Sequence, residues 1–189
     1  ARGTQAAHLD AIEQVVARHG ARFAQGRKES AERVIEALGP AFEQMAAPGL
    51  RCVPSYEPGG IGDKDSFAEQ LLQRRSKDFF RGAATFGPQR DELHISIEGR
   101  AARSHASQGQ QRLLTLSLKM AELSCVREVT GMEPMLLLDD VSSELDHERT
   151  TAVFNFLKNA RNQIFVTTTR PELFSNVTLD DSLRADFRV

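Results

Sequence analysis

Several common features are missing from this chain of 189 residues. It has no G-x-x-x-x-G-K-[ST] loop, the element that cradles the β- and γ-phosphates of a nucleotide. It has no tryptophan and 1 tyrosine beside 11 phenylalanines, which leaves little basis for an aromatic platform that stacks single-stranded bases. A nucleotide site in this chain would therefore lack the loop that binds the β- and γ-phosphates.

Cysteines and long apolar runs are also scarce. The 2 cysteines, Cys52 and Cys125, lie far apart, and the sequence shows neither a signal peptide nor an apolar run near the roughly 20 residues that span a bilayer. Both cysteines fall in apolar patterns, so we expect core packing rather than metal or redox chemistry. None of the 5 histidines has a partner at metal-ligand spacing. We expect a cytoplasmic protein with no membrane contact.

The chain also lacks a large excess of either charge. With 24 basic and 26 acidic residues the formal net charge is -2, so contact with nucleic acid would have to come from local patches. One basic cluster lies in an expected helix, at Arg74, Arg75, Lys77 and Arg81. We interpret that cluster as a solvated helix face in preference to a nucleic-acid contact.

The first part of the chain has apolar residues at helical spacing over residues 6–46. Gly20 and Gly26 interrupt this pattern, which ends at Gly39-Pro40 or at Pro48-Gly49. They predict two or three antiparallel helices in an arm-like bundle rather than one long rod.

The rest of the chain alternates strands and helices. The patterns predict a strand at 50–58, a helix at 66–81, a hairpin at 93–101, a helix at 113–126, a buried strand at 135–138, a helix at 146–160 and a strand at 164–167. The last three elements form a βαβ unit, whose strands should be parallel with a right-handed crossover. We therefore divide the chain into a helical arm, residues 1–82, and an α/β part, residues 83–189.

A polar turn, Ser107, Gln108, Gly109 and Gln110, opens one of these helices. Ser107 and Gln110 have the spacing of a capping box, in which the serine oxygen accepts an amide proton and the glutamine reaches back to the cap. Gly109 has no Cβ, so an anion could approach the backbone amides at the positive end of the helix dipole. The turn predicts a phosphate-binding site, although the same residues would also serve at the N-terminus of a helix that binds no ligand.

Two carboxylates, Asp139 and Asp140, directly follow the buried strand. In a mononucleotide-binding α/β sheet, a carboxylate at the carboxyl end of a central strand can hold Mg²⁺, directly or through water. The next carboxylate can orient or deprotonate the attacking water. The alternative is an aspartate pair that caps a turn.

Two further motifs have simpler explanations. Asp146, at the end of Ser-Glu-Leu-Asp, is a helix cap by position. Arg90 and Asp91 stand next to each other after Gly87-Pro88. We favour a local ion pair that fixes a turn over a role in a site.

Three blocks of the sequence, 87–93, 107–123 and 135–146, together resemble the carboxyl-terminal half of RecF, a family of bacterial recombination and repair ATPases related to SMC proteins. The combination of Ser-Gln-Gly-Gln-Gln-Arg with Leu-Leu-Leu-Asp-Asp-Val carries the resemblance, and the helical stretch before Gly49 is similar to the RecF lever arm. The resemblance implies an α/β fold: an incomplete ABC-type ATPase head, with the signature and Walker B part, joined to an α-helical arm. The amino-terminal Walker A lobe is expected to be absent.

Four residues acquire a role from this resemblance: Ser107, Gln108, Gly109 and Gln110 match the family's signature motif. In RecF-like dimers that motif acts in trans, on the γ-phosphate of ATP held by the other subunit. The resemblance implies ATP and Mg²⁺ as cofactors of the full-length protein, an ATP-dependent homodimer and weak DNA-stimulated ATP hydrolysis. It also implies binding to double-stranded DNA and to double-strand/single-strand junctions, and action with RecR and RecO to load recombinase on gapped DNA.

Four more positions match family motifs. Asp139 corresponds to the Walker B magnesium ligand, Asp140 to the catalytic carboxylate and Asp146 to the D-loop aspartate. Thr168 stands where many relatives keep a switch histidine. Because the phosphate loop is missing, we expect this chain alone neither to hydrolyse ATP nor to bind it tightly.

Two other functions stay open. An SMC-type or transporter-type ATPase head would share the carboxylate strand, although an SMC head follows a far longer coiled coil and a transporter more often reads Leu-Ser-Gly-Gly-Gln. A non-catalytic helical interaction module on an α/β scaffold would be indifferent to nucleotide.

Overall fold

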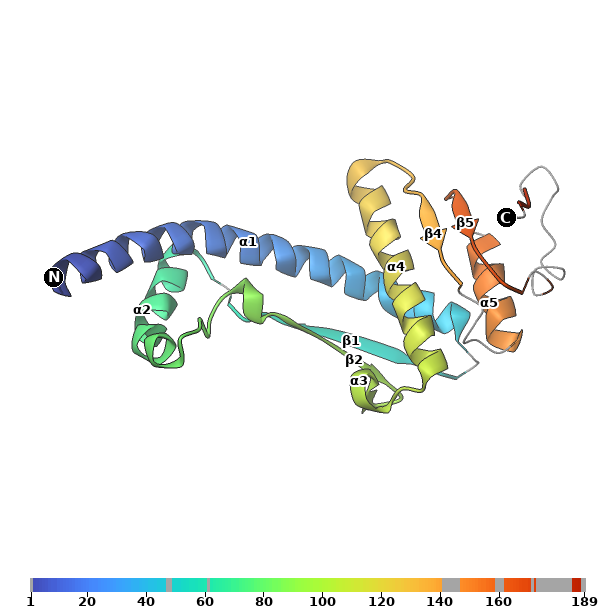
Figure 1. The fold of residues 1–189 in the computed structure, drawn as a ribbon, viewed down its shortest axis with the longest axis horizontal. Helices are drawn as coiled ribbons and strands as arrows, with labels where there is room; N and C mark the ends of the chain where they lie inside the picture. The colour runs from blue at the N-terminus through green and yellow to red at the C-terminus, as the bar shows by residue number, and fades with distance from the viewer. Residues whose placement is uncertain are drawn as a thin grey trace. The chain divides into compact units, whose positions relative to one another are not determined.

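The computed structural model describes residues 2–46, 49–60, 62–140, 147–158, 162–170, 172 and 185–187 (Figure 1). The chain forms two compact units, each built from two stretches of sequence. Unit 1 combines Ala1–Ile35 with Pro54–His94, and unit 2 combines Glu36–Val53 with Ile95–Val189. One helix and two strands continue from one unit into the other.

Helices and strands follow the predicted order for most of the chain. They are α1 (Arg2–Met45), β1 (Cys52–Glu57), α2 (Lys64–Arg81), the 3-10 turn η1 (Pro88–Arg90), β2 (Glu92–Ile97), β3 (Arg100–Ala101), α3 (Ala102–His105), α4 (Gln108–Thr130), β4 (Leu136–Leu138), α5 (His147–Lys158) and β5 (Ile164–Val166). The strand near 50–58, the helix near 66–81 and the hairpin after it are confirmed.

Helix α1 is one uninterrupted helix of 44 residues, so the prediction of two or three antiparallel helices is wrong. Gly20 does not break the helix, because its missing side chain makes room for a ring. A Cβ at Gly20 would lie 2.9 Å from two ring carbons of Phe67. Pro40 lies inside the helix, where Leu38 and Phe42 are fully buried. Burial of such side chains contributes ~1.5–3 kcal/mol each, which offsets the roughly 3 kcal/mol that an interior proline costs.

A small apolar core holds unit 1 together. Helix α1 contributes Ala17, Ala21 and Ala24, and Phe67 of α2 packs with Phe86 against them. The two phenylalanine rings meet edge to face with their centroids 4.7 Å apart. The alanines have short side chains, so α2 can pack close to the α1 backbone.

The basic cluster of α2 is only partly solvated. Arg75 is half-buried, and its Nη2 donates to carboxylate oxygens of Asp10 and Glu13 at 2.5 Å each. Arg74 lies over the Phe86 ring, with its guanidinium carbon 5.3 Å from the ring centroid. Two of the four cations therefore stabilise unit 1 itself, and the prediction of a wholly solvated face is wrong for them.

Unit 2 contains a parallel pair of strands. Strand β4 pairs with β5, with Leu136 opposite Ile164 and Leu138 opposite Val166 (Figure 1). Helix α5 lies between them in the sequence, which confirms the predicted βαβ order with parallel strands. The carboxyl ends of both strands therefore lie at the same edge. Among the described residues, no helix combines the length and apolar character needed to span a membrane.

Candidate functional site

The polar turn at the start of α4 is a complete capping box. The Ser107 hydroxyl accepts from the Gln110 N–H at 3.3 Å, and the Gln110 side-chain oxygen accepts from the Ser107 N–H at 2.9 Å. Ser107 and Gln108 are exposed, whereas Gly109 is buried. The turn is thus fixed, and the part of it that a ligand or a second protein can reach is formed by Ser107 and Gln108.

The two predicted carboxylates follow β4, and Thr167 follows β5 at the same edge. The Thr167 hydroxyl donates to Oδ1 of Asp139 and accepts from the backbone N–H of Asp140 at 3.2 Å. The Thr167 N–H in turn donates to the carbonyl of Leu138 at 2.9 Å. Asp139 is exposed and Asp140 is half-buried. A carboxylate open to solvent at a strand end can bind a cation or a hydrated ligand.

Helix α4 contacts the carboxylate turn directly. Nη2 of Arg112 donates to the backbone carbonyl of Asp140 at 2.5 Å. Asp140 has a φ of 45°, in the left-handed region that aspartate tolerates better than most residues. The helix that Ser107 caps therefore also holds the turn of Asp140.

A cavity of about 420 Å³ lies between α4 and β4. Its wall includes Gln108, Gln111, Arg112 and Lys119 from α4 and Asp139 after β4. The structure thus brings Gln108 and Asp139, two of the predicted site residues, to one cavity. Cationic and anionic side chains share its wall, a mixture suited to a phosphate together with its cation.

The donor set at this edge can be compared with the needs of Mg²⁺. The described residues contain no group of three or more His, Cys, Asp or Glu side chains that could hold a metal by themselves. Mg²⁺ does not require one, since it keeps several waters and is commonly bound by one or two carboxylates plus substrate phosphates. The exposed Asp139 carboxylate fits that pattern.

Two other predicted site residues are Thr168 and Asp146. The Thr168 hydroxyl accepts from the Arg170 N–H at 3.0 Å and so fixes the turn after β5. Thr168 does not line the cavity between α4 and β4. Asp146 lies outside the described residues.

The predicted Arg90–Asp91 ion pair is wrong. The Asp91 carboxylate accepts from Arg27 Nε at 2.5 Å, the Tyr56 hydroxyl at 2.6 Å and the Gly59 N–H at 2.9 Å. Asp91 follows the 3-10 turn η1, of which Arg90 is the last residue, and has extended backbone angles. Arg90 is exposed, whereas the Asp91 side chain is 2% exposed.

Burial and hydrogen bonding act in opposite directions on Asp91. Burial raises the pKa of its carboxyl, but hydrogen bonds from Tyr56, Gly59 and Arg27 outweigh that effect and hold the pKa below its usual value. Asp91 therefore stays charged and anchors α1 to the segments around β1 and β2. Sequence reasoning missed this role because Arg27 is 64 residues away.

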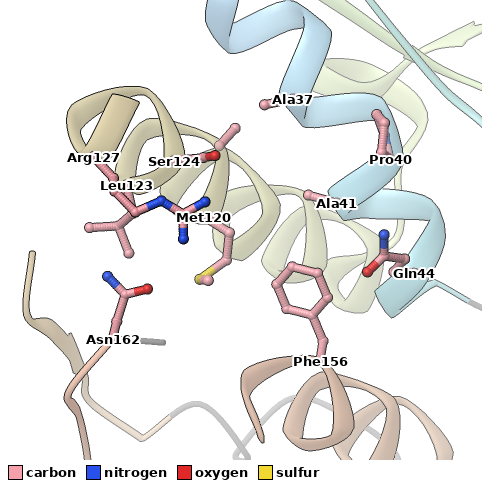
Figure 2. A pocket seen from close by; sticks show the side chains of 11 residues that line it. Ala37, Pro40, Ala41, Gln44, Met120, Leu123, Ser124, Arg127, Phe156 and Asn162 are labelled. Atoms are coloured by element: carbon pink, nitrogen blue, oxygen red, sulfur yellow. The ribbon is translucent and has the colours of Figure 1, made fainter. Parts of the chain in front are cut away.

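A second cavity of unit 2, of about 370 Å³, contains none of the predicted site residues (Figure 2). Figure 2 shows the end of α1, α4 and α5 around it, with Ala41, Met120 and Phe156 on its apolar side and Arg127 and Asn162 on its polar side. Asn162 is held there by a hydrogen bond from its Nδ2 to the Pro134 carbonyl at 2.7 Å.

Sequence reasoning also missed Arg112 and Thr167. Their three hydrogen bonds to Asp139 and Asp140 join residues that are 27 or 28 apart in the sequence, and no local pattern reveals them. The one available signal was positional: Thr167 follows the second strand of a parallel pair, so it had to lie at the edge where the carboxylates are.

Comparison with known proteins gives a consistent result. No family model matches the chain. The chain is 34% identical over 96% of its length to the DNA replication and repair protein RecF of Myxococcus xanthus, covering 50% of that protein. It is 40% identical over 80% of its length to RecF of Anaeromyxobacter, covering 44%, and 35% identical over 82% to RecF of Geobacter sulfurreducens, covering 44%. The chain spans about half the length of these relatives.

Solved structures agree. The recombination mediator protein RecF of the RecFOR pathway, in complex with ATPrS, matches 85% of this chain and 45% of its own with a TM-score of 0.68 and 26% identity. The ATP complex matches 85% and 44% with the same score and 27% identity. An SMC head bound to the C-terminal winged-helix domain of ScpA matches 86% and 43% with a TM-score of 0.53 and 17% identity, which shows the fold alone. The mixed, mostly helical fold is that of RecF and SMC heads, which confirms the predicted fold class.

Proposed function

This chain belongs to the RecF family and corresponds to its carboxyl-terminal half, and from that premise we propose that it supplies the signature and Walker B parts of an ATP-driven switch. Its relatives are DNA replication and repair proteins, and RecF is an ABC-type ATPase. Two solved relatives are complexes of RecF with ATP and with ATPrS, which supports ATP as the ligand.

One observation carries this proposal: the exposed carboxylate of Asp139 stands at the carboxyl end of the parallel strands β4 and β5, where the Thr167 hydroxyl donates to it. In the proposed site Asp139 would hold Mg²⁺, directly or through water. Asp140 orients the attacking water or accepts its proton. When bound, Mg²⁺ neutralises charge that develops on the phosphates.

The signature turn is proposed to serve a second subunit. Ser107, Gln108, Gly109 and Gln110 form the proposed signature motif, in which Ser107 and Gln108 would contact the γ-phosphate of ATP held by the partner in an ATP-dependent homodimer and Gly109 and Gln110 would fix the turn. The exposure of Ser107 and Gln108 supports this role, because a buried turn could not reach another molecule. Asp146 is proposed as the D-loop aspartate and Thr168 as the residue at the switch position.

The wider role follows from the family rather than from the geometry. We infer binding to double-stranded DNA and to double-strand/single-strand junctions, and cooperation with RecR and RecO to load recombinase. The support is that the solved relatives are recombination mediators of the RecFOR pathway.

ATP-dependent association of the full-length protein tests the proposal. Light scattering is expected to show a dimer only with ATP and Mg²⁺, and Ser107→Arg is expected to abolish the dimer because a bulky cation blocks the turn. Asp140→Asn is expected to keep the dimer and lose turnover. Association that ignores ATP would instead identify a non-catalytic interaction module.

The chain by itself provides the complementary test. Without a phosphate loop it is expected to show no ATP turnover and no tight ATP binding by calorimetry. Turnover by the pure chain that disappears in Asp140→Asn would overturn the proposed division of the site.

A further inference from the structure

We propose that Thr167 is a positioning residue for both carboxylates of the site, an inference that rests on the proposed roles of Asp139 and Asp140. A hydroxyl has one proton to donate and two lone pairs, so a single threonine can engage two groups at once. Thr167 does so: it donates to the Asp139 carboxylate and accepts from the Asp140 N–H at 3.2 Å.

The backbone of Thr167 is itself fixed by the parallel strands. Leu138 pairs with Val166, and the Thr167 N–H continues this ladder with a bond to the Leu138 carbonyl at 2.9 Å. A β-branched side chain on a fixed backbone has few rotamers. The hydroxyl is therefore held at the strand edge before any ligand arrives.

Thr167 also stabilises an unusual backbone conformation. Asp140 has a φ of 45°, and its peptide groups are held on both sides: Thr167 accepts from its N–H, and Arg112 donates to its carbonyl at 2.5 Å. Without the hydroxyl, the Asp140 N–H would lose this partner and the turn could relax, which would move the carboxylate. The same loss would free the Asp139 carboxylate to change its rotamer.

The three residues therefore have different roles. Asp139 and Asp140 act on the ligand, and Thr167 fixes the positions of their carboxylates. Groups that orient a metal ligand typically affect metal affinity or activity by about 10- to 100-fold when removed. We expect an effect of that size on Mg²⁺ use and on turnover, with little change in the KM for ATP.

The test compares three variants of the full-length protein. Thr167→Val removes the hydroxyl and keeps the shape, whereas Thr167→Ser keeps the hydroxyl. Thr130→Val is the matched control, because the Thr130 hydroxyl also donates one bond, to Val126, and accepts one, from the Met132 N–H. Thr130 closes the far end of α4 and has no role in the proposed site.

Two readouts separate positioning from a merely structural role. One is Mn²⁺ affinity measured by electron paramagnetic resonance in the presence of ATP, and the other is the Mg²⁺ concentration that gives half-maximal turnover. We expect Thr167→Val to weaken both by about 10-fold or more, Thr167→Ser to restore them to within about 3-fold, and Thr130→Val to leave them unchanged.

Several results would overturn the inference. Thr167→Val with wild-type Mn²⁺ affinity, even if its melting temperature falls, would show a structural role only. Thr167→Ser as impaired as Thr167→Val would show that the methyl group matters and the hydroxyl does not. If Asp139→Asn abolishes Mn²⁺ binding while Thr167→Val does not, this inference fails alone. If Asp139→Asn has no effect, the proposed function itself fails.

Discussion

Asp91 is a charged residue that the protein encloses rather than exposes. Its side chain is 2% exposed, and its carboxylate accepts three hydrogen bonds from separate parts of unit 1. A buried charge is tolerated only when it is paired and hydrogen-bonded in this way. The residue therefore connects α1 to the segments around β1 and β2.

Asp91→Asn should lower the free energy of unfolding at pH 7 by about 1.5–3 kcal/mol, because the hydrogen bonds it weakens involve a charged group. Its native pKa is lowered, so the stabilisation is complete above the unfolded-state pKa of roughly 3.9 and is lost as pH falls through the native value. Urea unfolding from pH 7 to pH 3 measures this. Glu92→Gln, at an exposed neighbour, is the control and should change stability by less than about 0.5 kcal/mol. A difference between Asp91→Asn and wild type that grows toward low pH would contradict the assignment.

The two cysteines should differ in reactivity. Burial, with a further contribution from the charge of Glu43, raises the pKa of Cys52 to about 11, and the thiolate is the reactive form. Cys125 is only half-buried. At pH 8 a disulfide reagent is expected to label Cys125 first and Cys52 only on unfolding. Cys52→Ala and Cys125→Ala assign the two phases, and rapid labelling of Cys52 in the folded protein would refute this.

At the scale of elements, α1 shows where a local pattern misleads. Glycine and proline usually mark helix ends, yet Gly20 and Pro40 both lie inside a single helix. The reason is contact with distant residues, above all the Phe67 ring against Gly20, which no local pattern contains. By contrast, β4, α5 and β5 were predicted correctly, because an apolar run and a helical period are properties of the segment itself.

The candidate site divides in the same way. The capping box of Ser107 and Gln110 was predicted because its two hydrogen bonds join residues three apart. The contacts of Arg112 and Thr167 depend on the register of β4 and β5 and on how α4 packs, so they could be found only in the folded chain. The sequence pattern therefore indicated the candidate site residues, whereas the residues that hold them in place could be identified only from tertiary contacts.

Two glycines of α1 provide a matched pair. Gly20→Ala should destabilise the protein by about 1–3 kcal/mol, because the added methyl group meets the buried Phe67 ring at 2.9 Å. Gly26→Ala has no atom within 4 Å of the added Cβ and should stabilise the helix by up to about 1 kcal/mol. Thermal and urea unfolding measure both. Equal stabilisation by the two substitutions would mean that Phe67 does not pack against Gly20.

At the scale of the whole molecule, the chain has two units but no linker between them in the described residues. The boundary falls inside α1, β1 and β2 rather than in a loop. Domains joined by flexible loops are cut there by proteases, whereas a backbone in a helix has to unfold locally before it can be cleaved.

Limited trypsin digestion should therefore spare Arg33, although it is exposed and lies beside the boundary at Ile35. Mass spectrometry of early fragments measures this, with heat-unfolded protein as the control in which Arg33 is cut. Early cleavage at Arg33 in the native protein would show that α1 opens between the two units.

Helix α4 begins at the turn capped by Ser107 and holds the Asp140 carbonyl through Arg112. Under the proposed arrangement, that helix serves the neighbour's nucleotide and its own subunit's carboxylates at the same time. A lesion in the first turns of α4, between Gln108 and Arg112, then disables two pockets rather than one. Such an allele would be dominant, because a mixed pair of one healthy and one damaged copy would have no intact pocket left.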